Sequence, residues 1–128
     1  MWKDLIKNFK PAFIYQPKNL FQCEKDWEQK FTFGKYVLYE TNAEIDYDIN
    51  GDLSLLLMTS GSTGSPEFVR LSHANIYSNT KSICEYLKIG KNDKAITTLP
   101  MSYSYGISII NTHLFSGASL ILTDSSIV

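Results

Sequence analysis

The segment from Met58 to Pro66 reads Met-Thr-Ser-Gly-Ser-Thr-Gly-Ser-Pro and has the composition of an anion-binding loop. Gly61 and Gly64 allow positive φ angles and let the backbone approach a ligand closely. Consecutive backbone N–H groups in such a turn form an anion-binding nest, and the neighbouring hydroxyls add neutral donors. Each donor contributes roughly 1.5–3 kcal/mol when it meets a charged phosphate oxygen. The candidate phosphate-binding residues are Thr59, Ser60, Gly61, Ser62, Thr63, Gly64 and Ser65.

Two other functional loops share part of this composition and are excluded by their spacing. A Walker A loop needs Lys directly after its last glycine, whereas Ser65 and Pro66 follow Gly64 here. A nucleophile elbow needs Gly-x-Ser-x-Gly, which the segment lacks. A flexible Ser/Gly connection without any ligand stays open as the alternative.

The elements around this loop predict an α/β fold. The apolar run Leu53–Met58 suits a strand buried on both faces, which places the loop at the carboxyl edge of a sheet. Ser72 is an expected N-cap for a helix from His73 to about Lys88. Strands and helices alternate from residue 53 onward, so we predict a largely parallel sheet with flanking helices. The expected later elements are strands at 68–71, 94–99 and 118–123 and a helix at 104–116.

The first half of the chain carries weaker signals. Leu5, Ile6 and Phe9 fit a short helix that Pro11 ends, and residues 12–15 and 36–39 are expected strands. Residues 16–34 show no pattern that predicts an element, and residues 40–52 have the composition of a loop.

A second motif, Leu99-Pro100-Met101-Ser102-Tyr103-Ser104-Tyr105-Gly106-Ile107, follows the loop. Together, the loop with its continuation Val69, Leu71-Ser72-His73 and this motif resemble the AMP-dependent synthetases and ligases. That family includes acyl-CoA synthetases, luciferases and nonribosomal-peptide adenylation domains. The resemblance is strong over residues 53–123 and weaker over 5–52, so residues 1–128 are expected to be part of one AMP-binding domain.

The resemblance implies that a carboxylate attacks the α-phosphate of ATP to give an acyl adenylate and pyrophosphate, and that the acyl group then passes to a thiol. It implies that the Gly/Ser/Thr loop holds the leaving phosphates and that Mg²⁺ shares their charge. It also places Tyr103 and Gly106 at the acyl pocket. No catalytic residue and no protein ligand of a metal is assigned.

The chain departs from the family pattern at several points. Glu67 and Phe68 stand where the family carries Lys and Gly, and Arg70 is an alternative source of positive charge. The aromatic-Gly-x-Thr-Glu motif, the ribose-binding Thr-Gly-Asp and the late catalytic Lys are missing from this sequence. We therefore expect an internal fragment of the N-terminal domain that is inactive alone and needs the remainder of the ligase. A non-catalytic nucleotide- or phosphate-binding domain and an interaction module that pairs through a sheet edge stay open as alternatives.

The composition of the chain limits the classes of protein and partner that remain to be considered. Among 128 residues, 44% are hydrophobic and 20% are charged, which is globular composition. The formal net charge of −1 disfavours nucleic-acid or anionic-membrane partners. The two cysteines, Cys23 and Cys84, lack metal-binding spacing and are expected to be reduced thiols in a cytoplasmic protein.

Overall fold

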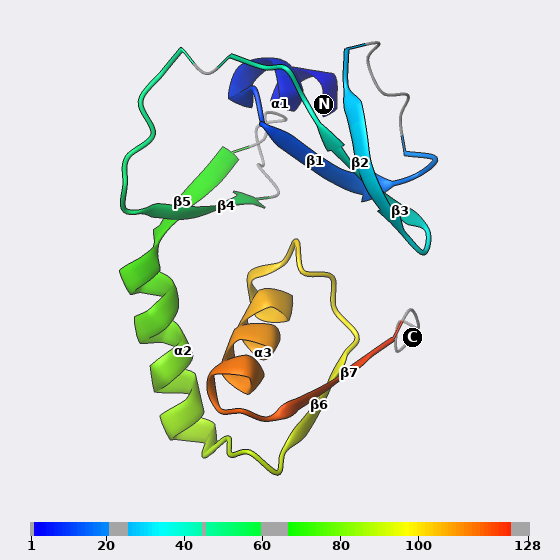
Figure 1. Cartoon of the computed structure of the whole chain (residues 1–128). Helices are drawn as coiled ribbons and strands as arrows, with labels where there is room; N and C mark the ends of the chain where they lie inside the picture. The colour runs from blue at the N-terminus through cyan, green and yellow to red at the C-terminus, as the bar shows by residue number, and fades with distance from the viewer. Residues whose placement is uncertain (1, 21–25, 45, 60–66, 124–128) are drawn as a thin grey trace. The chain divides into compact units, whose positions relative to one another are not determined.

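The structure is a computed structural model that describes residues 2–20, 26–44, 46–59 and 67–123 (Figure 1). The chain divides into two compact units, Met1–Asp48 and Ile49–Val128. Cys23 lies outside the described residues. In the described part of the chain, no helix is long and apolar enough to cross a membrane.

The first unit consists of one helix and a three-stranded antiparallel sheet in the order β1-β3-β2. The β2–β3 hairpin was not predicted, because its signal is confined to a tight turn in which Gly34 has φ +57°. Val37 lies at the buried face of the sheet, whereas the opposite face exposes aromatic side chains. The elements of this unit are α1 (Trp2–Phe9), β1 (Phe13–Pro17), β2 (Glu28–Phe33) and β3 (Tyr36–Glu40).

An ion cluster joins β2 to β3 in this unit. Glu28 and Glu40 occupy directly opposed positions, where two like charges repel. The Lys30 ammonium lies 2.9 Å from a Glu28 carboxylate oxygen and 2.5 Å from one of Glu40. Hydrogen bonds to Glu40 and then to Glu28 raise the pKa of Lys30 above the ordinary value of 10.5.

The second unit contains two strand pairs and two helices. Strands β4 and β5 pair antiparallel, and β6 and β7 pair parallel. Helix α3 lies between β6 and β7 in the chain and forms their crossover. The elements are β4 (Leu53–Thr59), β5 (Glu67–Ser72), α2 (His73–Leu87), β6 (Lys94–Thr97), α3 (Ser104–Phe115) and β7 (Ser119–Leu122).

The prediction of a largely parallel sheet is wrong for the described residues, whose sheets are mostly antiparallel. The cause is the connection between β4 and β5. Residues 60–66 are too few for a parallel crossover, which takes about a dozen residues, so these two strands form a hairpin. The α/β composition itself is confirmed, since helices and strands alternate from β5 onward.

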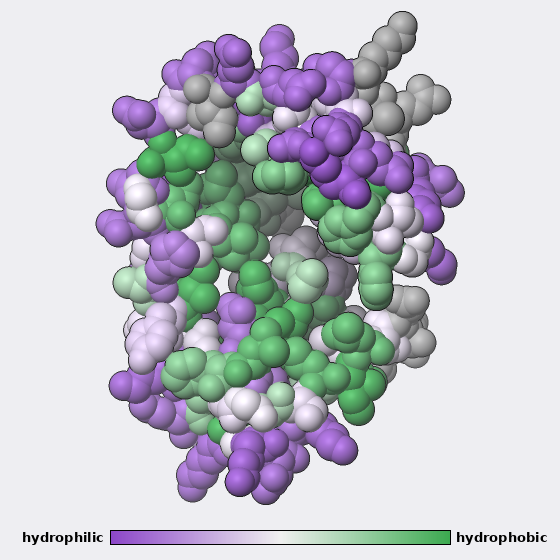
Figure 2. All heavy atoms as spheres, viewed as in Figure 1, coloured by the Kyte–Doolittle hydropathy of each residue, from purple (hydrophilic) through white to green (hydrophobic). Residues whose placement is uncertain are grey.

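The prediction that β4 is buried on both faces is also wrong. Its leucines are half-buried, Ser54 is exposed and Met58 is 44% exposed. Strands β6 and β7 expose large apolar side chains as well, including Ile96, Ile121 and Leu122. Figure 2 shows hydrophobic side chains at the surface in the region of β6 and β7.

Helix α2 begins with a reciprocal capping box, which confirms Ser72 as its N-cap. The backbone N–H of Asn75 donates to Ser72 Oγ at 3.1 Å, and the backbone N–H of Ser72 donates to Asn75 Oδ1 at 3.0 Å. At the other end, Lys88 adopts the left-handed conformation with φ 55°, and its backbone N–H donates to the carbonyl of Cys84. At both ends of α2, therefore, backbone groups that lack a partner within the regular helix form hydrogen bonds.

We predict that Ser72→Ala lowers the free energy of unfolding by about 1 kcal/mol, because it removes the hydroxyl half of the capping box. Urea denaturation followed by circular dichroism measures this loss. The matched control is Ser78→Ala, an exposed position within α2. An equal loss in both variants would contradict the assigned role of the cap.

We further predict that Lys30→Met destabilises the first unit at neutral pH, because Glu28 and Glu40 then face each other without a cation. The folded state raises the pKa of Lys30. Its stabilising contribution is therefore complete below about pH 10.5 and lost as the pH rises through the higher folded value. The difference between the urea midpoints of the two proteins should shrink as the pH is raised from 7 toward 11.5. Lys18→Met, which removes an exposed turn lysine, should change the midpoint far less at neutral pH.

Candidate functional site

The β4–β5 hairpin holds the two ends of the predicted phosphate loop side by side. Thr59 and Glu67 are register partners, and Thr59 Oγ1 donates to the Glu67 carbonyl oxygen at 3.3 Å. Antiparallel pairing thus fixes the point where the loop leaves the sheet. The other predicted loop residues lie outside the described residues, so their role in binding phosphate stays a prediction: Ser60, Gly61, Ser62, Thr63, Gly64 and Ser65.

Helix α2 follows β5 directly, so the N-terminus of the helix lies at the end of the hairpin opposite Thr59 and Glu67. His73 is its first residue, and the backbone N–H of His73 donates to the Asp52 carbonyl at 3.3 Å. This contact ties the start of the helix to the start of β4. It agrees with the expectation that His73 marks a helix start.

Glu67 lies at the loop end of β5, and its side chain is exposed. Arg70 is three residues further along the strand, opposite Leu56. An odd separation along a strand places two side chains on opposite faces, and three residues span roughly 10 Å. Arg70 is therefore badly placed to offset the charge of Glu67.

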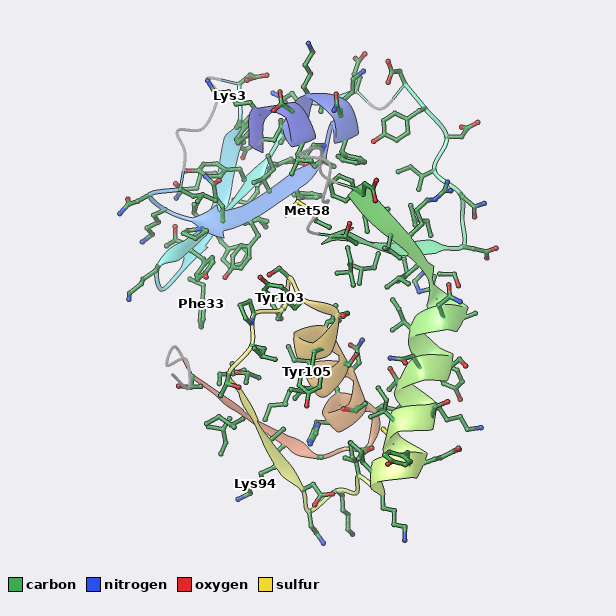
Figure 3. The ribbon with its side chains drawn as sticks, turned by 180° about the vertical axis from the view of Figure 1, so that it is seen from behind. Lys3, Phe33, Met58, Lys94, Tyr103 and Tyr105 are labelled. Carbon is green, nitrogen blue, oxygen red and sulfur yellow. The ribbon has the colours of Figure 1, made fainter. Side chains whose placement is uncertain are left out.

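The second motif folds into a turn that enters α3. The Tyr103 backbone N–H donates to the Pro100 carbonyl at 3.1 Å, and Ile107 N–H donates to the Tyr103 carbonyl at 3.1 Å. Tyr103 is the N-cap residue, with 64% of its surface exposed, and Tyr105 lies in the first turn with 65% exposed. Figure 3 labels Tyr103 beside the turn that enters α3 and Tyr105 further along the helix.

Gly106 has a packing role in this turn. It is buried, and a Cβ atom placed on it would lie 2.3 Å from the Pro100 carbonyl oxygen and 2.9 Å from that of Leu99. The first turn of α3 can approach the preceding loop only because residue 106 has no side chain. The predicted contribution of Tyr103 and Gly106 to an acyl pocket stays a prediction.

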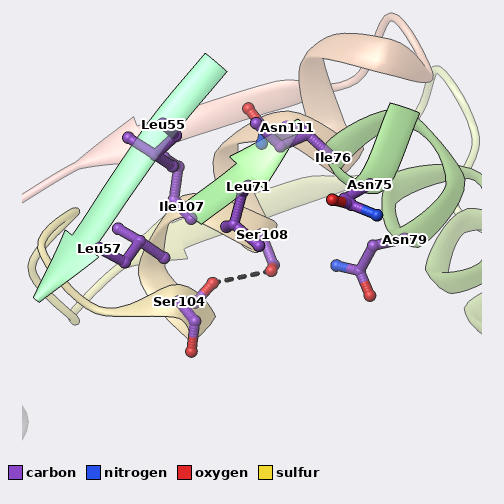
Figure 4. A pocket seen from close by; sticks show the side chains of 10 residues that line it. All are labelled: Leu55, Leu57, Leu71, Asn75, Ile76, Asn79, Ser104, Ile107, Ser108 and Asn111. Carbon is purple, nitrogen blue, oxygen red and sulfur yellow. Dashed lines mark hydrogen bonds between the residues drawn. The ribbon is translucent and has the colours of Figure 1, made fainter. Parts of the chain in front are cut away.

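A pocket of about 200 Å³ opens next to this turn, between the β4–β5 hairpin, α2 and α3 (Figure 4). Leucine and isoleucine side chains supply its apolar walls, and amide and hydroxyl groups supply its polar ones. The lining residues are Leu55, Leu57, Leu71, Asn75, Ile76, Asn79, Ser104, Ile107, Ser108 and Asn111.

The polar part of this pocket was not predicted from the sequence. The available signal was the spacing of Asn75 with Asn79 and of Ser104 with Ser108, because residues four apart share one face of a helix. That spacing identifies a face but not what the face meets. The antiparallel hairpin that completes the pocket was not predicted.

The part of the chain that the structure describes contains no cluster of side chains typical of a metal site. Within those residues, His, Cys, Asp and Glu form no group of three or more that could hold an ion. The acidic residues Asp46, Asp48 and Asp52 are all exposed, and the Asp46 carboxylate instead meets the Lys10 ammonium at 2.8 Å. A hydrogen bond from Lys10 lowers the pKa of Asp46 below its ordinary range.

Residues 5–128 match the family model described as "AMP-binding enzyme". The match covers nearly the whole chain and includes both motifs. The chain therefore belongs to the family of AMP-binding, adenylate-forming enzymes.

Curated relatives include ligases and synthetases. The chain is 37% identical over 76 residues to the acyl-CoA synthetase ALT10 of Alternaria alternata, covering 58% of this chain and 13% of that protein. It is 31% identical over 120 residues to gramicidin S synthase 2 of Brevibacillus brevis, covering 87% of this chain and 3% of that protein. The chain thus spans a small part of the length of these relatives.

Solved structures give the same result for the fold. The ATP-bound crystal structure of MatB from Rhodopseudomonas palustris matches 70% of this chain with a TM-score of 0.54 and 28% identity, and the match covers 18% of MatB. The complex of VinN with L-aspartate matches 66% of this chain with a TM-score of 0.54 and 30% identity, covering 22% of VinN. The local fold is thus shared with adenylate-forming enzymes.

We predict that Gly106→Ala destabilises the chain by about 1–3 kcal/mol, since the new methyl group overlaps backbone carbonyl oxygens that cannot rotate away. Chemical denaturation measures the loss. The control is Gly90→Ala, where a Cβ atom meets nothing within 4 Å. A Gly106→Ala variant as stable as the control would show that the close approach imposes no constraint.

Proposed function

We propose that this chain supplies the phosphate-binding loop and part of the acyl pocket of an ATP-dependent ligase that makes acyl adenylates. In the proposed reaction, a carboxylate oxygen attacks the α-phosphorus of ATP and the bond to the bridging oxygen breaks. Acyl-AMP and pyrophosphate result, and a thiol then attacks the acyl carbon, forming a thioester while the bond to AMP breaks and AMP leaves. Family membership supports this proposal, as does the likeness to ATP-bound MatB.

One observation carries the proposal. The loop with the family's composition is joined to a hairpin whose paired ends are Thr59 and Glu67, and a capped helix begins at the far end of β5. Strand pairing holds Thr59, and a donor that is held in place needs little reorganisation when negative charge accumulates on the leaving phosphates. The role proposed for the segment from Thr59 to Ser65 is therefore to stabilise pyrophosphate as it departs.

The acyl group is proposed to enter beside the second motif. The exposed Tyr103 side chain is available to orient the reacting carboxylate, and the neighbouring pocket has room for the rest of the acid. Gly106 supports this arrangement indirectly by allowing α3 to start close to Pro100.

Magnesium enters the proposal through family resemblance alone. The described residues offer no ligand set for it. We therefore propose that oxygen atoms of the nucleotide supply most of its ligands, which is common for Mg²⁺ at phosphate sites.

The remainder of a ligase is proposed to be necessary for turnover. Motifs that the family uses for adenine, ribose and the late lysine are missing from this sequence. The chain alone is therefore expected to bind phosphate groups without completing adenylation. A cytoplasmic setting is proposed as well, with support from the free, buried thiol of Cys84.

Glu67 favours a second candidate function, a phosphate-binding domain that has lost catalysis. A carboxylate about 4 Å from a phosphate charge costs about 1 kcal/mol in water and about 4 kcal/mol at an effective dielectric constant of 20. Joining this chain to the missing motifs separates the candidates. ATP–pyrophosphate exchange supports the ligase, whereas ATP binding without exchange supports the second candidate.

We predict that Glu67→Lys tightens the binding of pyrophosphate and ATP by at least about fivefold, because it replaces repulsion near the loop with attraction. Isothermal titration calorimetry of the full chain measures both affinities. The control is Glu85→Lys, which makes the same change of charge at an exposed position of α2. Unchanged or weaker affinity in Glu67→Lys would contradict binding at this loop, and so would an equal gain in both variants.

A further inference from the structure

The pocket between the β4–β5 hairpin, α2 and α3 has an electrically neutral lining. Half of its lining residues are aliphatic, and the others are Asn and Ser. Among the described residues that line it, none carries a charge. Asn75, Asn79 and Ser104 are exposed at its opening, whereas the other lining residues are half-buried. An ammonium or carboxylate group placed against the half-buried part would lose hydration without gaining a counter-ion, which is unfavourable.

The polar side chains of the pocket differ in whether they already form hydrogen bonds within the protein. Asn75 is occupied by the cap of α2, and Ser108 Oγ donates to the Ser104 carbonyl at 2.7 Å. The side-chain amides of Asn79 and Asn111 make no hydrogen bond to any other residue that the structure describes. Figure 4 shows Asn79 extending from α2 toward the turn that carries Ser104 and Ser108. An asparagine amide both donates and accepts, so it can pair with a neutral polar group.

The volume sets the size of what can enter. A cavity of about 150 Å³ can hold a benzene molecule, so about 200 Å³ holds a group of similar or slightly larger size. Branched side chains of Leu55, Leu57 and Ile107 form apolar walls that favour carbon over water.

We infer that this pocket selects acids with a short, uncharged tail that ends in a neutral hydrogen-bonding group, and that Asn79 is the residue that determines this specificity. The inference rests on the proposed function, which makes a carboxylic acid the substrate. The additional claim concerns the chemical class of the acid's tail and the residue that contacts it. Asn111, on the facing helix, is the second polar group available to the same tail.

Four acids with a four-carbon backbone test the inference, because they differ only in the group at the far end. Succinamate ends in a carboxamide, succinate in a carboxylate, 4-aminobutyrate in an ammonium group, and butyrate in a methyl group. Dissociation constants for the full chain are measured by nuclear magnetic resonance titration with ¹⁵N-labelled protein. We expect succinamate to bind at least about tenfold more tightly than succinate and 4-aminobutyrate.

Variants of Asn79 complete the test. Asn79→Asp should weaken succinamate binding and make 4-aminobutyrate the preferred probe, whereas Asn79→Leu should remove the advantage of succinamate over butyrate. The matched control is Asn92→Asp, which adds the same charge in an exposed turn outside the pocket and should preserve the wild-type order. Equal affinity for all four acids, preference for a charged tail, or no binding of any acid at about 10 mM would overturn the inference.

A parallel titration with pyrophosphate separates this inference from the proposed function. If pyrophosphate fails to bind but succinamate binds with the expected order, the proposed ligase role fails while the pocket retains its specificity. If pyrophosphate binds and the acids show no order, the proposed function stands and the assigned specificity is wrong.

Discussion

The antiparallel pairing of β4 with β5 is the constraint on which the second unit depends. It sets Thr59 against Glu67 and so determines where the Gly/Ser/Thr loop leaves the sheet. It ends at Ser72, where the capping box starts α2 without an intervening linker. The same two strands contribute Leu55, Leu57 and Leu71 to the pocket wall. One hairpin thus positions both the candidate phosphate loop and the candidate acyl pocket.

Neutral groups dominate both candidate sites. The loop offers backbone N–H groups and hydroxyls, and the pocket offers amides, hydroxyls and aliphatic walls. The charged residue at the end of the loop is Glu67, whose sign opposes phosphate, and Arg70 is on the other face of the strand. Neither Glu67 nor Arg70 therefore supplies positive charge at the loop end of β5.

Much of the local structure could be predicted from the sequence. The cap at Ser72, the length of α2 and the start of α3 at Ser104 follow from local side-chain chemistry, which needs no knowledge of distant contacts. Strand pairing was predicted less well, because the apolar run at 53–58 has the same pattern in a parallel sheet and in a hairpin. The short connection at 60–66 distinguishes the two arrangements, because it is too short to join parallel strands. The packing role of Gly106 and the place of Asn79 in the pocket could not be predicted from sequence, because both depend on contacts between separate segments of the chain.

The central claim, that the Gly/Ser/Thr loop binds phosphate groups, is tested most directly by titrating the ¹⁵N-labelled chain with pyrophosphate and following every backbone amide. The account predicts that the largest and saturable shifts occur at residues 59–67, and that the first turn of α2, at the other end of the hairpin, changes less. Shifts that are absent would contradict it. The same holds for shifts that are largest around Lys88, Lys91 and Lys94, where any anion could gather on exposed lysines.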